Sequence, residues 1–297
     1  RDWSSDVCSS DLITTWQSIF RQPSAWFKQF DVIFGDEAHN FKAKSLTFVM
    51  EKLSTCRYRT GTTGTLDNSK VHKLVLEGVF GPVHKVISTK ELMDSNRVAK
   101  LKIKCLLLKY DDMTRQIVNK STYQEEMDFI VKNDKRNKFI RNLTVSTEGN
   151  TLVLFQYVEK HGKILYEMIK DKVSKDRKVF FIYGGTDTED REAARIMMEG
   201  EDNAICIASF GVFSTGINIP SIENVIFASP SKSKIRNLQS IGRVLRKGAG
   251  KDMATLYDIA DDIGGQNYTL RHLNDRVTIY NEENFKYEVI KVNLRAN

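Results

Sequence analysis

Two carboxylates and an imidazole stand together early in this sequence, at Asp36, Glu37 and His39. They follow the apolar run Val-Ile-Phe at 32–34, which is short and β-branched and typical of a buried parallel strand. There, Asp36 and Glu37 are candidate metal ligands: Asp36 could hold Mg²⁺ through water, and Glu37 could orient or deprotonate an attacking water. His39 would couple them to neighbouring elements. The alternative is a plain strand end followed by an ordinary loop histidine.

A second group, Gln239, Arg243 and Arg246, lies within Gln-Ser-Ile-Gly-Arg-Val-Leu-Arg. Apolar residues recur at helical spacing over 235–245, which predicts a helix that ends before Gly248. On that helix the three polar side chains share one face. Arginine suits phosphate, because its planar fork binds oxygens bidentately and keeps its charge. The alternative is a basic surface helix. Together with the carboxylates, these side chains are parts that a nucleotide hydrolase needs.

The elements that position these groups alternate between short apolar strands and amphipathic helices. This alternation predicts an α/β fold, with parallel sheets and flanking helices on both faces. We expect strands at 31–35, 58–66, 100–110, 152–155, 179–183, 204–208, 225–227 and 255–259. We expect helices at 123–143 and 161–173, and a terminal helix and strand within 268–297. The polar stretch 93–97 is the expected linker, which divides the chain into domains at 13–97 and 98–297.

Length and composition allow two domains in a chain of 297 residues that is 41% hydrophobic. The formal charge of +7 is compatible with a polyanionic partner. Four cysteines without paired spacing indicate neither a zinc site nor a disulfide framework. No stretch reaches the length of a membrane span and no signal peptide is recognisable, so we expect a cytoplasmic location with no membrane partner.

The first twelve residues, Arg-Asp-Trp-Ser-Ser-Asp-Val-Cys-Ser-Ser-Asp-Leu, do not fit the rest of the chain. They are similar to translated sequencing-adapter read-through, so we set residues 1–12 aside as non-native. The protein proper would then enter at about Ile13, in the middle of a domain. We therefore expect a fragment with a partial first domain and a complete second domain.

Together these segments resemble the superfamily 2 helicases and, more closely, the bacteriophage UvsW-type DNA helicases. The resemblance runs from Ile13 to near the C-terminus and includes Ile-Thr-Thr-Trp-Gln-Ser-Ile, Gly-Val-Phe-Ser-Thr-Gly-Ile and Gln-Ser-Ile-Gly-Arg-Val-Leu-Arg-Lys. Asp-Glu-Ala-His matches the family's motif II, Thr63-Gly64-Thr65 motif III, 155–157 motif IV, 209–218 motif V and 239–246 motif VI. Gln239 stands where RNA helicases of the DEAD-box type usually carry histidine, which favours a DNA translocase.

The resemblance implies RecA-like domains, with ATP and Mg²⁺ bound between them and DNA tracked along its backbone. The residues implied to contact the nucleotide are Thr63, Thr65, Gly216, Asn218, Gln239, Arg243 and Arg246. For Thr63 and Thr65, the alternative from the residues alone is a plain strand-end turn. The residues implied to contact nucleic acid are Thr15, Trp16, Gln17, Phe155, Gln156, Gly184, Ser209 and Thr215. Hydroxyls and amides suit phosphate contacts without base readout.

The family's substrates are branched DNA and RNA–DNA hybrids in recombination and repair, so the resemblance implies an ATP-dependent DNA helicase, expected as a monomer in a phage-infected bacterial host. No Gly-x-x-x-x-Gly-Lys-Ser/Thr occurs in the chain, so we expect the fragment to be inactive alone. Two alternatives stay open. One is a double-strand translocase that does not separate strands, and the other is a non-catalytic nucleic-acid clamp.

Overall fold

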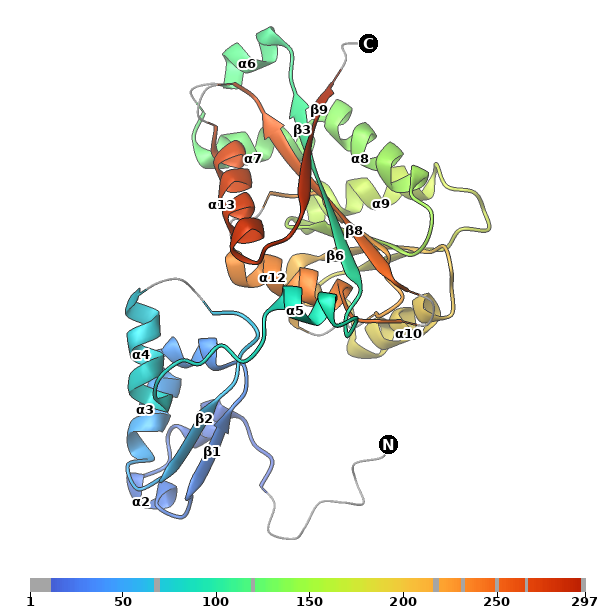
Figure 1. Cartoon of the computed structure of the whole chain (residues 1–297). Coiled ribbons are helices and arrows are strands. Elements are labelled where there is room, and N and C mark those ends of the chain that lie inside the picture. Colours follow the sequence, from blue (N-terminus) through green and yellow to red (C-terminus); the bar gives the residue numbers. More distant parts are fainter. Residues whose placement is uncertain are drawn as a thin grey trace. The chain divides into compact units, whose positions relative to one another are not determined.

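Figure 1 shows the computed structural model, which describes residues 12–66, 70–118, 121–215, 219–230, 233–248, 251–264 and 267–294. The first eleven residues, part of the segment set aside above, lie outside it. The chain divides into two compact units, Arg1–Lys85 (unit 1) and Val86–Asn297 (unit 2). The division falls upstream of residues 93–97, so the prediction of a linker at those residues was wrong. Those residues belong to unit 2, at the end of helix α5 (Thr89–Asp94) and the turn after it, because Met93 packs against the core of that unit.

Unit 1 is built on two parallel strands, β1 (Val32–Gly35) and β2 (Tyr58–Gly61), in register along their full length. Its helical segments are α1 (Trp16–Ile19), α2 (Ser24–Phe27), the 3-10 turn η2 (Ala38–Lys42), α3 (Lys44–Lys52) and α4 (Lys70–Phe80). Phe27, Met50 and Leu53 form a core, against which Ile33 of β1 packs. β1 lies close to where the sequence predicted it, whereas β2 begins as expected but ends at Gly61, and the rest of the stretch 58–66 is not strand.

The other face of this two-stranded sheet is exposed. Val32, Phe34 and Tyr58 point away from the core, and their side chains are 48%, 76% and 56% exposed. Parallel sheets are ordinarily buried on both faces, and two strands alone form a marginal sheet. Unit 1 therefore has an apolar sheet face that no described residue covers.

Unit 2 contains a seven-stranded sheet in which every neighbouring pair is parallel, in the order β5-β6-β4-β7-β8-β3-β9. The strands are β3 (Lys100–Lys109), β4 (Thr151–Phe155), β5 (Val179–Ile182), β6 (Ile205–Ser209), β7 (Asn224–Phe227), β8 (Met253–Asp262) and β9 (Tyr287–Asn293). The central strands read as continuous apolar runs because both of their faces are buried. The α/β prediction is confirmed, and so is the terminal helix and strand, since β9 adds the edge next to β3.

Helices cover both faces of the unit 2 sheet, as expected. One core contains side chains from α10 (Thr188–Glu199), α11 (Phe210–Thr215), α12 (Lys234–Val244) and α13 (Tyr268–Glu282). The opposite core contains side chains from α6 (Asp112–Val118), α7 (Tyr123–Lys132), α8 (Asp134–Ser146) and α9 (Lys163–Lys170), the last preceded by a π-helical turn, η3 (Val158–Gly162). None of the helices in these described ranges is long and apolar enough to span a membrane.

The single helix expected at 123–143 is two helices in the structure, so that prediction was wrong. Asn133 breaks it with an extended backbone (ψ 112°), and its side chain accepts a hydrogen bond from the Arg136 amide to cap α8. Thr122 and Glu125 form a capping box at the start of α7. Asparagine and threonine compete for backbone hydrogen bonds in this way at helix starts, which is why the apolar periodicity alone missed the break.

Candidate functional site

The acidic pair lies directly after β1, beside the end of β2. Pairing continues past both strands, because the Thr62 amide donates to the Gly35 carbonyl (2.9 Å) and the Ala38 amide donates to the Thr62 carbonyl (2.8 Å). The Asp36 carboxylate accepts from the Thr62 hydroxyl at 3.2 Å and from the Glu37 amide at 2.9 Å. The parallel register thus places the motif III segment against Asp36 and orients its carboxylate.

Close packing beneath the pair explains the glycine that ends each strand. A Cβ at Gly35 would lie 2.6 Å from the Phe80 ring, and one at Gly61 would lie 2.9 Å from the same ring. Phe80 also packs edge-on against Phe41, with ring centroids 5.0 Å apart. Only glycine permits this approach of an aromatic ring to both backbones. Phe80 is the last residue of α4, so this helix packs directly against the ends of the two strands that precede the acidic pair and the turn after β2.

Glu37 has a left-handed backbone, with φ 47° and ψ 49°. The other non-glycine residues with positive φ in the described part of the chain are Asn96 and Asn284, and asparagine tolerates this region far better than glutamate does. Such strain is held in place by its surroundings and is commonest at functional sites. The Glu37 side chain is half-exposed, with Oε2 3.2 Å from His39 Nδ1.

His39 connects the acidic segment after β1 to the turn after β2 through a partly buried contact. Its Nδ1 lies 2.8 Å from the Thr63 hydroxyl. That hydroxyl donates its own proton to the Thr65 carbonyl (2.9 Å), so it accepts from His39, and Nδ1 carries the proton. Burial lowers the pKa of His39, opposed by Glu37 and helped by Lys42, which favours the neutral ring. His39 thus contacts both Glu37 and Thr63, and its coupling role stays a prediction.

The two candidate threonines of motif III have different surroundings. The Thr63 hydroxyl is engaged by His39 and by the Thr65 backbone, whose amide donates to it at 3.2 Å. The Thr65 hydroxyl is buried and has no hydrogen-bond partner among the described residues. Thr63 is therefore placed to relay the state of motif II, which is one of the two roles the sequence suggested for this turn.

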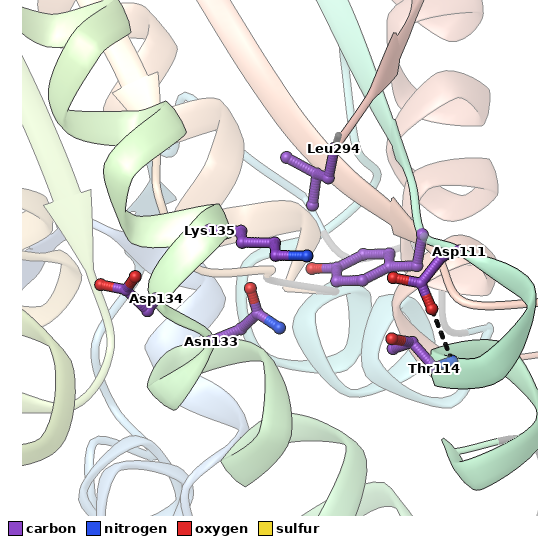
Figure 2. Close-up of a pocket in the computed structure, with 7 residues that line it drawn as sticks. Asp111, Thr114, Asn133, Asp134, Lys135 and Leu294 are labelled. Atoms are coloured by element: carbon purple, nitrogen blue, oxygen red, sulfur yellow. Dashed lines mark hydrogen bonds between the residues drawn. The ribbon is translucent and has the colours of Figure 1, made fainter. Parts of the chain in front are cut away.

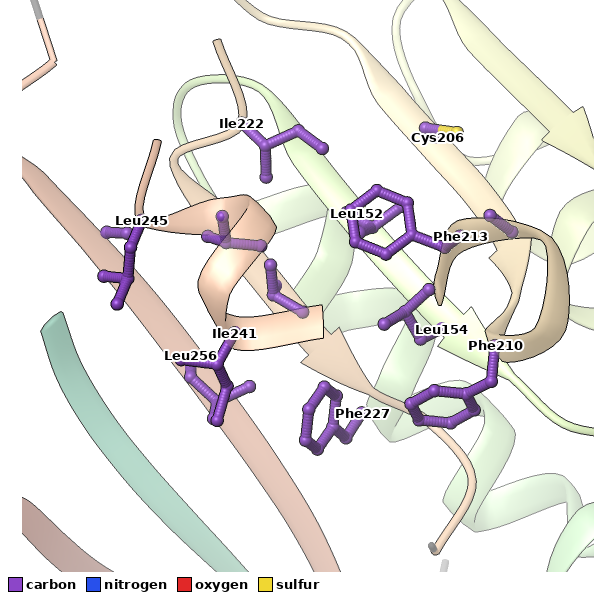
Figure 3. Close-up of a cluster of buried hydrophobic side chains, with 14 of the residues drawn as sticks. Leu152, Leu154, Cys206, Phe210, Phe213, Ile222, Phe227, Ile241, Leu245 and Leu256 are labelled. Carbon is purple, nitrogen blue, oxygen red and sulfur yellow. The ribbon is translucent and has the colours of Figure 1, made fainter. Parts of the chain in front are cut away.

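The arginine helix of unit 2 is α12, which packs on the sheet through Ile241, Val244 and Leu245. Figure 3 shows Ile241 and Leu245 among side chains of the sheet, as the sequence predicted. Gln239 and Arg243, both half-buried, lie one turn apart on this helix, so they share a face.

The placement of Arg246 on that same helical face was wrong. The helix ends at Val244, and Arg246 follows in a turn in which its amide donates to the Arg243 carbonyl at 3.3 Å. Its side chain is exposed. Carbonyls at and just after this end have partners outside the helix: that of Leu245 accepts from the Ala99 amide (2.9 Å), and that of Val244 accepts from the buried Lys251 ammonium. Periodicity could not reveal either contact.

The candidate nucleic-acid residues of unit 2 follow neighbouring strands at the carboxyl edge of the sheet, where ligands bind in such folds. Gln156 follows β4 and is exposed, Gly184 follows β5 with open space around its Cα, and Ser209 ends β6 with only 9% of its surface exposed. Gly216 and Asn218 lie outside the described residues, as does the side chain of Thr215.

Phe155 is a core residue and was wrongly assigned to nucleic-acid binding. Its side chain is fully buried, its ring stacks on Phe181 with centroids 5.5 Å apart, and a Cβ at Gly162 would lie 2.5 Å from it. As the last residue of a central parallel strand, it points into the covered face of the sheet. In unit 1, Thr15, Trp16 and Gln17 are exposed at the start of α1, with the Thr15 hydroxyl 2.9 Å from that of Ser18.

The acidic site could hold Mg²⁺ with only one or two protein ligands. Among the described residues no cluster of three histidine, cysteine or acidic side chains could hold a metal. Mg²⁺ is commonly held by one or two carboxylates, with waters and substrate phosphates completing its octahedron. Asp36, oriented by Thr62, and the half-exposed Glu37 are such a set. ATP phosphates would be required to complete it.

A separate pocket of about 260 Å³ lies at the ends of β3 and β9 (Figure 2). Tyr110, Asp111, Asn133 and Lys135 are among its lining residues, and the Thr114 amide donates to Asp111 at 2.8 Å. None of the candidate residues named above lines it. Its mixture of acidic and basic groups indicates no particular ligand.

Two parallel sheets with flanking helices, one ending in an acidic pair and one covered by a glutamine–arginine helix, have the α/β architecture of RecA-like helicase domains. Residues 134–248 match the family model of the helicase conserved C-terminal domain. The ATP-dependent DNA helicase UvsW of Enterobacteria phage T4 is 36% identical to this chain, over 95% of this chain and 59% of UvsW. The crystal structure of T4 UvsW matches with a TM-score of 0.58 and 35% identity, over 95% of this chain and 57% of that one. The chain is thus similar to the superfamily 2 helicases along 95% of its length.

More distant similarities extend across the family. The DNA 3'-5' translocase XPB2 of Sulfurisphaera tokodaii is 22% identical over 82% of this chain and 62% of its own length. The Type ISP restriction-modification enzyme LlaBIII, solved bound to DNA, shares the fold with a TM-score of 0.64 and 16% identity, over 94% of this chain and 23% of that one. The chain spans about three fifths of UvsW, 59% of its length.

Proposed function

We propose that this chain is the greater part of an ATP-dependent DNA helicase that works on branched DNA or RNA–DNA hybrids in recombination and repair. The relation to T4 UvsW over 95% of the chain carries the proposal, because it spans both the acidic site and the arginine helix. The chemistry of these two sites supports ATP as the substrate. Cycles of ATP binding and hydrolysis would move one strand stepwise, with contacts to its backbone.

In unit 1, Asp36 would hold Mg²⁺ and Glu37 would orient the attacking water and accept its proton. The metal would supply charge neutralisation on the phosphates. Asp36 is oriented for this by the Thr62 hydroxyl at 3.2 Å, and Glu37 is held by its left-handed backbone. The neutral His39 would transmit changes at Glu37 to Thr63, through the contact at 2.8 Å.

In unit 2, Arg243 and Arg246 would neutralise charge that develops on the transferred phosphoryl group, and Gln239 would hydrogen-bond near it. Arg243 and Gln239 lie on one face of a helix that packs on the sheet, whereas Arg246 lies in the turn after that helix. We assign to Arg246 the larger share of this charge neutralisation, because its side chain is exposed and can reach a ligand. Gly216, Asn218 and Thr65 would complete the nucleotide contacts.

The nucleic-acid contacts would come from Gln156, Gly184 and Ser209 with Thr215 in unit 2, and from the start of α1 in unit 1. Amides and hydroxyls at a sheet edge can bind phosphate oxygens without reading bases, as a translocating enzyme requires. The formal charge of +7 favours a polyanionic partner in general.

We also propose that the first domain is partial. Its two-stranded sheet exposes Val32, Phe34 and Tyr58 on one face, and the sequence has no phosphate-binding Gly-x-x-x-x-Gly-Lys-Ser/Thr. The purified chain is therefore expected to release no phosphate from ATP with or without DNA, because the backbone cradle and the lysine for the phosphates are missing. The measurement is a coupled phosphate assay with forked DNA. DNA-stimulated release by the purified chain would contradict this prediction.

Strand displacement by the complete protein tests the function itself. With the upstream coding sequence restored, we expect ATP-dependent displacement of one strand from a forked duplex, and none from the Glu37→Gln variant. The similarity to the translocase XPB2 supports a second candidate, a double-strand translocase without unwinding. ATP turnover with no displacement, together with removal of a triplex-forming strand from duplex DNA, would favour that candidate. No turnover with intact DNA binding would instead favour a non-catalytic clamp.

A further inference from the structure

A buried ammonium group closes the end of the arginine helix. Lys251, 6% exposed, donates from Nζ to the carbonyls of Pro220 (3.0 Å) and Arg246 (3.2 Å), and also to that of Val244. The last carbonyls of a helix have no partner within it, and a lysine near the C-terminus can satisfy them. Here one side chain bonds both the end of α12 and a separate segment of the chain.

The separate segment is the one that follows motif V. Pro220 stands two residues beyond the motif V stretch 209–218, and Gly248 packs on the same peptide, since a Cβ at Gly248 would lie 3.1 Å from the Pro220 carbonyl oxygen. The Lys251 amide also donates to the Gly248 carbonyl at 3.3 Å. The turn that carries Arg246 is thus fastened to the backbone just after the candidate nucleic-acid segment.

We propose that Lys251 is a positioning residue, which holds the peptide of Arg246 against the segment after motif V so that the arginine is presented in one place. This inference rests on the proposed function, because it needs Arg246 to act on the nucleotide. An ammonium group suits the role because it has three donors, and three carbonyls accept from it. Without it, buried carbonyls lose their partners and the turn loses its anchor.

The charge on Lys251 depends on pH within an accessible range. Burial lowers its pKa from the ordinary value of 10.5 to about 8, opposed by the carboxylate of Glu223. The charged residues on the segments around it are Glu223 before β7, Arg246 and Lys247 after α12, and Asp252 beside it. Above about pH 8 the amine has two protons left for three carbonyls, so the anchor weakens.

Titration of Lys251 does not itself favour unfolding in this range. The folded-state pKa lies below the unfolded value, so the unfolded chain binds more protons between about pH 8 and 10.5. This group therefore stabilises the fold more as the pH rises through that window. A fall in turnover as the pH rises, without a fall in melting temperature, separates positioning from stability.

The test compares Lys251→Met and Lys251→Arg with Lys247→Met, an exposed neighbour, in the complete protein. We expect Lys251→Met to lower kcat for ATP by about tenfold or more and to change KM and DNA affinity by less than about threefold, because misplacing a reacting group is costly. Lys247→Met should match the parent. Lys251→Arg should restore most of the turnover and remove the loss above about pH 8, since arginine does not titrate there.

Two outcomes would overturn the proposal: parental turnover by Lys251→Met, or an alkaline loss that persists in Lys251→Arg. Arg246→Ala, assayed in parallel, identifies which inference has failed. If Arg246→Ala retains full turnover, the proposed function itself is wrong at this site. If Arg246→Ala is inactive while Lys251→Met is unaffected, only the positioning role is wrong. Should Lys251→Met not fold, the pH profiles of Lys251→Arg and the parent decide, because an alkaline loss of turnover shared by both would overturn the proposal.

Discussion

Arg246→Ala in the complete protein is expected to lower ATP turnover about a thousandfold, while DNA affinity stays within a few fold. An arginine that stabilises the charge of a transferred phosphoryl group commonly contributes about 10³ or more to the rate. The Arg246 side chain is exposed and does not pack in the core. Its backbone carbonyl accepts a hydrogen bond from Lys251, which anchors the turn. The measurement is steady-state phosphate release, with DNA binding followed by fluorescence anisotropy.

The matched control for that experiment is Lys247→Ala, which removes the next exposed cation along the chain. If the positive charge of Arg246 acted only through the electrostatic potential of the whole surface, both variants would lose similar amounts of ATP turnover and DNA affinity. Near-parental turnover by Arg246→Ala would show that this arginine does not act on the phosphate. Arg243→Ala would then be the remaining candidate, since Arg243 projects from the rigid helix instead of the turn.

Asp261→Asn is expected to destabilise unit 2 by about 3–5 kcal/mol, the usual cost of leaving a buried charge unpaired. Asp261 and Arg136 are both fully buried and form a two-pronged pair, with Nε to Oδ1 at 2.8 Å and Nη2 to Oδ2 at 3.1 Å. The Tyr110 hydroxyl donates to the same carboxylate at 2.8 Å. The pair joins α8 to the end of β8, so its loss would be felt across the sheet. Urea unfolding of the purified chain measures it.

A surface pair supplies the comparison. Glu201→Gln breaks the pair of Lys178 and Glu201 (2.6 Å), which is half-exposed on the lysine side and should cost under about 1 kcal/mol. The double variant Arg136→Met/Asp261→Leu should recover most of the lost stability, because it removes both charges from the interior. Equal effects of Asp261→Asn and Glu201→Gln would show that the Arg136–Asp261 pair is reached by water.

A similar pair lies on the opposite face of β8, where Arg276 of α13 donates from Nε to Asp258 Oδ2 at 2.8 Å and forms an ion pair between Nη2 and Oδ1 at 2.7 Å. The Tyr280 hydroxyl donates to Asp258 at 2.7 Å. Successive positions of a strand alternate between faces, so Asp258 and Asp261 point to opposite sides. Each carboxylate ties one layer of helices to the sheet.

Much of the architecture could be predicted from local pattern. The apolar runs at 32–34 and 152–155 became strands close to where they were expected. For 152–155 the reason is that a strand buried on both faces must be apolar along its length, whereas one face of 32–34 is exposed. Packing of Ile241 and Leu245 on the sheet also followed from helical spacing. The break at Asn133 and the division between the units did not, since side-chain capping and the core that α5 joins decided them.

The candidate site divides in the same way. By itself the sequence determined which chemical groups are available: carboxylates after a strand, a histidine two residues on, and a glutamine with arginines one turn apart. It did not determine that Phe155 is buried, that Arg246 leaves the helix, or that His39 reaches Thr63. Nor could it show that Lys251 joins Pro220 to the end of α12. Those outcomes depend on contacts between residues far apart along the chain, which only the pairing of strands and the packing of layers bring within hydrogen-bonding distance.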